Sequence, residues 1–290
     1  MTGATPDIPY KSGASARSRD RSTAPSRKRA AVSQLLPIHR LTVIAKTPLL
    51  VALGLYMAGG HFEWATVGAT LGLSALLWGT LYAVNEAFDL ALEDGYAVSQ
   101  ATIALLIGVV LLICGAAYQV SPSLAIIFGM MTAGQLAYCA PPLRLKRWWW
   151  PVLLLSGMFN PVLRAYCGAI WGPTPMPAMA VLAIVLIHVG STIRTRGLQR
   201  ERDRKLDYTI APPSIDRVGA VFTALGILDS VYLCFISVLP RSFLLSVPFV
   251  VGFTLYAWSD RAKSMYKVRR GWFLFAIGAM FGLFVLLRGQ

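Results

Sequence analysis

The sequence predicts an all-α, polytopic integral membrane protein with nine transmembrane helices. The chain of 290 residues is 56% hydrophobic, and only 14% of its residues are charged, against roughly a quarter in a soluble domain. In addition, nine apolar segments approach the roughly 20 residues that a helix needs to cross about 30 Å of hydrocarbon. These segments are approximately 41–60, 63–84, 101–119, 122–140, 151–171, 175–193, 217–238, 243–259 and 271–287.

Lysine and arginine residues gather on one side of this predicted topology. With the N-terminus inside, they cluster in the N-terminal tail and around the inner loops, which are expected at 85–100, 141–150, 194–216 and 260–270. Cytoplasmic loops carry such an excess of bases, so the N-terminus is expected on the cytosolic side. The net charge of +14 could attract nucleic acid, but an anionic lipid bilayer is the simpler partner, and we expect no nucleic-acid binding.

The domain organisation follows from a change in composition. Residues 1–36 are polar and rich in Ser, Arg and Lys, so they are expected to form a disordered basic tail. Residues 37–290 then form one membrane domain. The tail contains few acidic residues, which also fits an organelle transit peptide and hence an organelle membrane. A cytosolic tail beside anionic lipid is the simpler interpretation, and the oligomeric state stays open.

A first polar cluster lies at the inner end of the second predicted span. Asn85, Asp89 and Glu93 are spaced four residues apart, so on a helix they share one face. Three oxygen-bearing side chains on one face offer the ligands that hard cations such as magnesium prefer. The spacing alone fits a solvated acidic helix end equally well.

A second cluster lies at the inner end of the sixth predicted span. Glu201 and Asp203 alternate there with bases, among them Arg204 and Lys205. Carboxylates that hold a metal, beside bases that neutralise an anion, suit a site for a metal–diphosphate complex. An ordinary positive inner loop would explain the bases but not the two acids.

A third cluster follows the fourth predicted span. Pro141 and Pro142 end that span and turn the chain, so that Arg144 and Lys146 are expected to point together toward the inner face. A basic anchor beside the membrane is the alternative, and both interpretations can hold at once.

Arg164 lies inside the fifth predicted span. A charged side chain at that depth costs about 2.5 kcal/mol or more unless it faces a cavity or a partner, so Arg164 is a candidate functional residue. A structural ion pair with Asp229 is the alternative.

Together these segments resemble the UbiA superfamily of intramembrane prenyltransferases, over essentially residues 37–290. That family has nine helices and two Asp-rich motifs on inner loops after the second and sixth spans. Its first motif, N-D-x-x-D-x-x-x-D, is matched by Asn85, Asp89 and Glu93, with Glu86 and Glu93 in place of Asp. Its inner segment Y-S-x-P-P-L-R-L-K is similar to the stretch from Tyr138 to Lys146, which is the most specific element of the resemblance.

The chain departs from the family pattern in the second motif, which is usually D-x-x-x-D. Gln199 stands at its first position and Asp203 at its second, and Glu201 is a candidate to replace the missing carboxylate. Asp207 stands where the family commonly has Gly. These departures weaken the second metal site.

The resemblance implies transfer of an isoprenyl group from a prenyl diphosphate to an aromatic or similar acceptor, with magnesium assisting diphosphate release. The implied metal ligands are Asn85, Asp89, Glu93, Glu201 and Asp203. The implied diphosphate-binding residues are Arg144, Lys146, Arg204 and Lys205. The implied catalytic residues are Asp89, Asp203, Arg164 and Tyr138, with Arg164 stabilising developing negative charge and Tyr138 beside the allylic cation.

Two alternatives stay open beside this interpretation. A UbiA-type terpene cyclase would act on a prenyl diphosphate without an acceptor, and the loss of a carboxylate at Gln199 is the reason to consider it. A non-catalytic membrane homologue or a transporter is the alternative outside enzymes. Transporters, however, are expected to carry charged residues or broken helices near the midplane of several spans.

Overall fold

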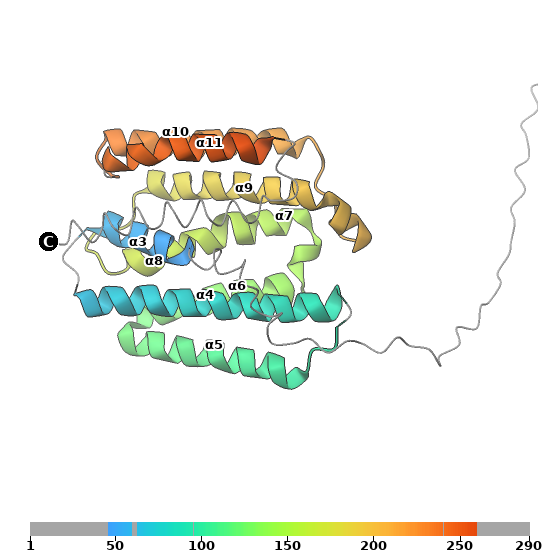
Figure 1. Ribbon diagram of the computed structural model, residues 1–290. Coiled ribbons are helices and arrows are strands. Elements are labelled where there is room, and N and C mark those ends of the chain that lie inside the picture. Colours follow the sequence, from blue (N-terminus) through green and yellow to red (C-terminus); the bar gives the residue numbers. More distant parts are fainter. Residues whose placement is uncertain (1–45, 60–62, 95, 240, 260–290) are drawn as a thin grey trace, which may run out of the picture.

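A computed structural model describes residues 46–59, 63–94, 96–239 and 241–259 of the chain, and the regular elements in these ranges are helices (Figure 1). The α-helices are α3 Lys46–Ala58, α4 Trp64–Leu92, α5 Gln100–Val120, α6 Pro122–Cys139, α7 Trp149–Val152, α8 Asn160–Ala169, α9 Ala178–Lys205, α10 Ile215–Phe235 and α11 Val247–Trp258. Three further short elements are η3 Leu145–Arg147, η4 Leu153–Phe159 and η5 Arg241–Ser246.

Six helical segments are long and apolar enough to cross a membrane. They are α4, α5, α6, the continuous segment Trp149–Ala169, α9 and α10. The all-α membrane class is therefore confirmed, whereas the count of nine spans is not. Helix α3 has 13 residues and α11 has 12, and the predicted span 271–287 lies outside the described residues.

Helices α3 and α8 pack against each other in the middle of the bundle. Figure 1 shows α10 and α11 on one side of this pair, and α4 and α5 on the other. Backbones approach closely at this contact, because a Cβ atom on Gly168 would lie 2.0 Å from the Val51 carbonyl oxygen. One on Gly54 would lie 1.8 Å from the carbonyl oxygen of Ala165. Small residues allow such close approach between membrane helices.

Helices α4 and α9 continue beyond their apolar segments. The sequence predicted that the second span ends near residue 84 and the sixth near residue 193, but α4 extends to Leu92 and α9 to Lys205. The predicted inner loops at 85–100 and 194–216 therefore begin with helix. Polar side chains along these ends bond to one another, as Asn85 does to Asp89, and so remain compatible with a helix.

The fifth span contains a π-helical segment in its middle. Element η4, a π-helix, joins α7 to α8, and Pro161 lies in the first turn of α8. Because Trp149–Ala169 is continuous, Pro161 lies inside the span, where it cannot donate a backbone hydrogen bond and its ring crowds the preceding turn. Widened turns of this kind often occur at functional sites, and here the segment includes Ser156 and precedes Asn160, both of which line the cavity described below.

Asp207 has a left-handed backbone conformation directly after α9, with φ of 55°. It is the first residue after the C-cap Leu206. Helices most often have Gly at this first residue after the cap. This conformation explains why Gly is expected here, and Asp is among the few residues that tolerate it.

We expect Asp207→Gly to preserve the stability of the protein and Asp207→Val to lower it by about 1–2 kcal/mol. Thermal unfolding of the purified protein in detergent measures both effects. Asp207→Asn is the control for loss of the carboxylate charge, since Asn also tolerates this conformation. Equal melting temperatures for the Val and Gly variants would contradict the prediction.

Candidate active site

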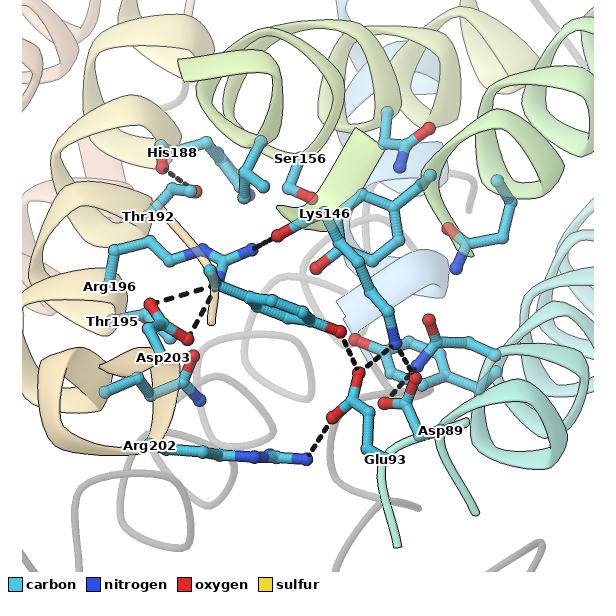
Figure 2. A pocket seen from close by; sticks show the side chains of 18 of the residues that line it. Asp89, Glu93, Lys146, Ser156, His188, Thr192, Thr195, Arg196, Arg202 and Asp203 are labelled. Atoms are coloured by element: carbon cyan, nitrogen blue, oxygen red, sulfur yellow. Dashed lines mark hydrogen bonds and ion pairs between the residues drawn. The ribbon is translucent and has the colours of Figure 1, made fainter. Parts of the chain in front are cut away.

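A cavity of 290 Å³ lies between α4, α6, the fifth span and α9 (Figure 2). Its polar lining residues are Asn85, Asp89, Glu93, Gln135, Lys146, Ser156, Asn160, Arg164, His188, Thr192, Thr195, Arg196, Gln199, Arg202 and Asp203. Its aromatic lining residues are Trp78, Tyr82, Tyr138 and Tyr208.

Helix α4 presents one face to this cavity. Trp78, Tyr82, Asn85, Asp89 and Glu93 follow one another at intervals of three or four residues, and all five line the cavity. The Asn85 Nδ2 donates to Asp89 Oδ2 at 3.2 Å. The Asn85 Oδ1 is buried and accepts no hydrogen bond from the residues that the structure describes.

Two buried bases reach the carboxylates of α4. The Lys146 ammonium contacts the Asp89 carboxylate and lies 2.5 Å from Glu93 Oε1, and Arg144 Nη2 lies 3.3 Å from the same Glu93 oxygen. Lys146 is only 4% exposed and Arg144 7%. Such buried charges need close partners, because taking them out of water is expensive. The segment after the fourth span thus delivers both bases to the carboxylates predicted as metal ligands.

Glu93 joins three separate segments of the chain. In addition to Lys146 and Arg144, it accepts hydrogen bonds from Arg202 Nη2 and from the Tyr208 hydroxyl, each at 2.7 Å. Burial and the hydrogen bond to Glu93 raise the pKa of Tyr208 above its usual range, so this hydroxyl stays a donor at neutral pH. Glu93 therefore ties the end of α4 to the segments that follow α6 and α9.

Asp203 faces Asp89 across the cavity from helix α9. Both Asp203 oxygens lie close to Arg196 Nη1, at 3.2 and 3.3 Å. The other terminal nitrogen of Arg196 donates to the Lys146 carbonyl at 2.8 Å. Figure 2 shows Arg196 and Asp203 on one side of the cavity, and Asp89 and Glu93 on the other. The two clusters that the sequence places more than 100 residues apart thus line one shared cavity.

Arg164 stacks on an aromatic ring within the cavity wall. Its Cζ lies 3.5 Å from the centroid of the Trp78 ring, and the residue is 6% exposed. A guanidinium over the face of Trp is stabilised by the ring quadrupole, and more strongly away from water. The alternative ion pair is not formed, since neither carboxylate oxygen of Asp229 has a hydrogen-bond partner within the described ranges.

Three predicted site residues lie outside the cavity. Glu201, Arg204 and Lys205 are exposed, and Glu201 pairs with Lys205 at 3.3 Å on the surface of α9. The reason is that α9 remains helical to Lys205, which turns these side chains away from the face that carries Asp203. Their proposed roles in binding metal and diphosphate are therefore not retained.

Several cavity residues were not predicted as site residues from the sequence. Trp78 lies seven residues before Asn85, and Arg196 lies seven before Asp203, so in each case two helical turns of spacing indicated a shared face. Asn160 similarly precedes Arg164 by one turn. Tyr208 lies in the connection after α9, and no sequence pattern points to its contact with Glu93.

The oxygen ligands on α4 fit a hard cation better than those on α9. On α4, the buried and unpartnered Asn85 Oδ1 lies beside the Asp89 carboxylate, and oxygen ligands of this kind suit magnesium. On α9, the carboxylate of Asp203 is already paired with Arg196. Within the described ranges, no group of three or more His, Cys, Asp and Glu residues is arranged to hold a metal ion.

Comparison with known proteins identifies the fold. No protein-family model and no curated protein matches the sequence. Among solved structures, a UbiA homologue from Archaeoglobus fulgidus bound to DMAPP and Mg²⁺ matches with a TM-score of 0.65 and 15% identity, over 87% of this chain and 99% of that one. The same homologue bound to GPP and Mg²⁺ matches with a TM-score of 0.66, 16% identity and the same coverage.

A more distant structure has the same architecture. A digeranylgeranylglyceryl phosphate synthase matches with a TM-score of 0.59 and 12% identity, over 89% of this chain and 96% of that one. The chain therefore has the UbiA fold.

Proposed function

We propose that this chain is a UbiA-superfamily member that transfers an isoprenyl group from a prenyl diphosphate to an aromatic or similar acceptor. The observation that carries the proposal is the single cavity in which Asp89 and Asp203 face each other beside the buried Lys146. The structures with this fold that bind DMAPP or GPP together with Mg²⁺ support it. The excess of bases around the polar helix ends supports a cytosolic position for this end of the cavity.

The metal of this proposal is magnesium. Asn85 and Asp89 would hold it, with Asp203 on the opposite wall of the cavity. A bound magnesium ion would supply positive charge that stabilises the departing diphosphate.

The buried bases Lys146 and Arg144, together with the exposed Arg202, would bind the diphosphate and stabilise its departure. The carbon–oxygen bond of the substrate breaks, and the electron pair leaves with the diphosphate. Lys146, Arg144 and Arg202 surround the α4 carboxylates, so they lie where the new negative charge develops. Fixed cations aimed at developing charge, in a site that excludes water, lower the barrier of such a step.

Aromatic side chains would line the allylic cation that remains. Tyr82 and Tyr138 line the cavity together with the α4 carboxylates, and the electron-rich faces of aromatic rings stabilise cations. Trp78 supports Tyr82 through an edge-to-face contact with ring centroids 5.4 Å apart. The acceptor then supplies the electron pair for the new bond to the allylic carbon and loses a proton.

The test uses the purified full chain in lipid nanodiscs with magnesium. Geranyl, farnesyl and geranylgeranyl diphosphates are supplied with and without a panel of phenolic acceptors, while diphosphate release is measured and products are analysed by mass spectrometry. We expect release to depend on an acceptor and the product to have the mass of the prenylated acceptor. A cyclic hydrocarbon formed without acceptor would instead identify a terpene cyclase. The absence of release with every substrate would identify a non-catalytic protein.

A further inference from the structure

The carboxylates on the two walls of the cavity have different partners. On α4, Asp89 lies beside an amide oxygen of Asn85 that is buried, unpartnered among the described residues, and part of the cavity lining. Asn85 itself is 8% exposed. A buried acceptor without a donor is costly unless a cation or a donor meets it. Lys146 already contacts the Asp89 carboxylate, so the unmet group on this wall is the Asn85 oxygen, which needs a donor or a cation beside Asp89.

On α9, an arginine is already paired with the carboxylate. Arg196 is 6% exposed and lies within 3.3 Å of both Asp203 oxygens, and its bond to the Lys146 carbonyl fixes the guanidinium in place. Gln199, one helical turn before Asp203, lines the same cavity with a neutral amide. A divalent ion at Asp203 would face a fixed positive charge, with no second carboxylate on this wall to offset the repulsion.

Glu93 is not available as a further metal ligand. Its two oxygens already accept from Lys146, Arg144, Arg202 and Tyr208. The side chain is 4% exposed, so these partners fill its surroundings. Asp89 also contacts a base, Lys146, but of the three carboxylates it alone lies beside the unpartnered Asn85 oxygen. The ligands that remain for a cation are therefore Asn85 and Asp89.

The formal charge of this network favours one ion over two. Three carboxylates, those of Asp89, Glu93 and Asp203, are paired with four cations, those of Arg144, Lys146, Arg196 and Arg202. Arg164 also lines the cavity, so the surplus is two positive charges, and one divalent ion raises it to four, against the about three negative charges of a prenyl diphosphate. A second ion would raise the surplus to six and leave three positive charges uncompensated in a largely buried site, which is costly.

We propose that the cavity binds a single divalent ion, at Asn85 and Asp89, and that Arg196 supplies the positive charge on the α9 wall in place of a second ion. This inference rests on the proposed function and adds to it the number of metal ions and the part played by Arg196.

The number of bound ions is measured directly with Mn²⁺. The full chain in nanodiscs is titrated with Mn²⁺ in the presence of geranyl S-thiolodiphosphate, an unreactive substrate analogue, and the free ion is followed by electron paramagnetic resonance. We expect one Mn²⁺ per chain. We expect Asp89→Asn to abolish its binding and Asp203→Asn to leave the count at one. A count of two or of zero for the wild-type chain would overturn the inference, as would loss of the ion in Asp203→Asn.

A double variant tests the attribution to Arg196 and Gln199. We expect Arg196→Gln combined with Gln199→Asp to raise the count from one to two, because the α9 wall then offers two carboxylates without a guanidinium. Arg196→Lys is the matched control, since it keeps the charge and should keep the count at one. A double variant that binds the analogue with a single ion would overturn the role assigned to these two residues.

The same samples separate this inference from the proposed function. Retention of radiolabelled analogue is measured alongside the ion count. A chain that retains the analogue with two ions contradicts only the single-ion inference. A chain that retains no analogue at any Mn²⁺ concentration contradicts the proposed function, and the inference with it.

Discussion

Replacement of Asp89 by Asn is expected to lower the rate of diphosphate release by about 10²–10³-fold, the loss typical of removing one fixed electrostatic contact to a transition state. Asp89 is the carboxylate that both Asn85 and Lys146 contact. Its neutral replacement removes the charged ligand for a cation and one of the two carboxylates that Lys146 contacts. The rate is measured as diphosphate released per chain in nanodiscs, at saturating prenyl diphosphate.

Glu201→Gln is the matched control for this variant. It also converts a carboxylate to an amide in the polar end of the bundle, but Glu201 is exposed and lies outside the cavity. The control should retain the wild-type rate. If Asp89→Asn released diphosphate as fast as Glu201→Gln, the placement of the metal and diphosphate at α4 would be wrong.

Replacement of Gly168 by Ala is expected to destabilise the protein by about 3 kcal/mol, at the upper end of the usual range for overpacking. The added Cβ would lie 2.0 Å from the Val51 carbonyl oxygen and 2.5 Å from the Leu55 amide nitrogen. Both are backbone atoms of α3, so no side chain can rotate away to make room. The loss is measured as a lower melting temperature in detergent and a smaller folded fraction in size-exclusion chromatography.

Gly129→Ala provides the same chemical change without the contact. Gly129 also lies in a membrane-spanning helix, α6, and a Cβ there would meet no atom within 4 Å. Because Ala favours helix over Gly, this control should be neutral or slightly stabilising. Equal melting temperatures for the two variants would show that α3 and α8 do not pack as described.

Local spacing along helices was sufficient to predict part of the site. Asn85, Asp89 and Glu93 share a face whatever the rest of the chain does, because four-residue intervals bring side chains together on any α-helix. The bases Arg144 and Lys146 were likewise predictable, since prolines end the preceding helix and the bases follow at once.

Contacts between distant helices could not be predicted from local spacing. Arg196 is significant because it meets Asp203 and also the Lys146 carbonyl, and no local pattern reports the second contact. Which side chains near Asp203 line the cavity depends on whether α9 stays helical past its apolar part. It does, and Arg202 rather than Glu201 therefore lines the cavity. The count of nine spans is not confirmed: six segments of the described ranges are long and apolar enough, and residues 41–45 and 271–287 of the predicted spans lie outside those ranges.

The position of Glu93 has a consequence for turnover. In the proposed reaction, product release would remove diphosphate from a site lined by several cations. Without a counter-charge, these cations would repel one another or hold the next anion too tightly. Glu93 stays behind as a permanent counter-charge to Arg144 and Arg202. After release, the charges of the site would therefore remain largely balanced. The departing diphosphate would compete with the Glu93 carboxylate for the same hydrogen-bond donors, which would favour its release.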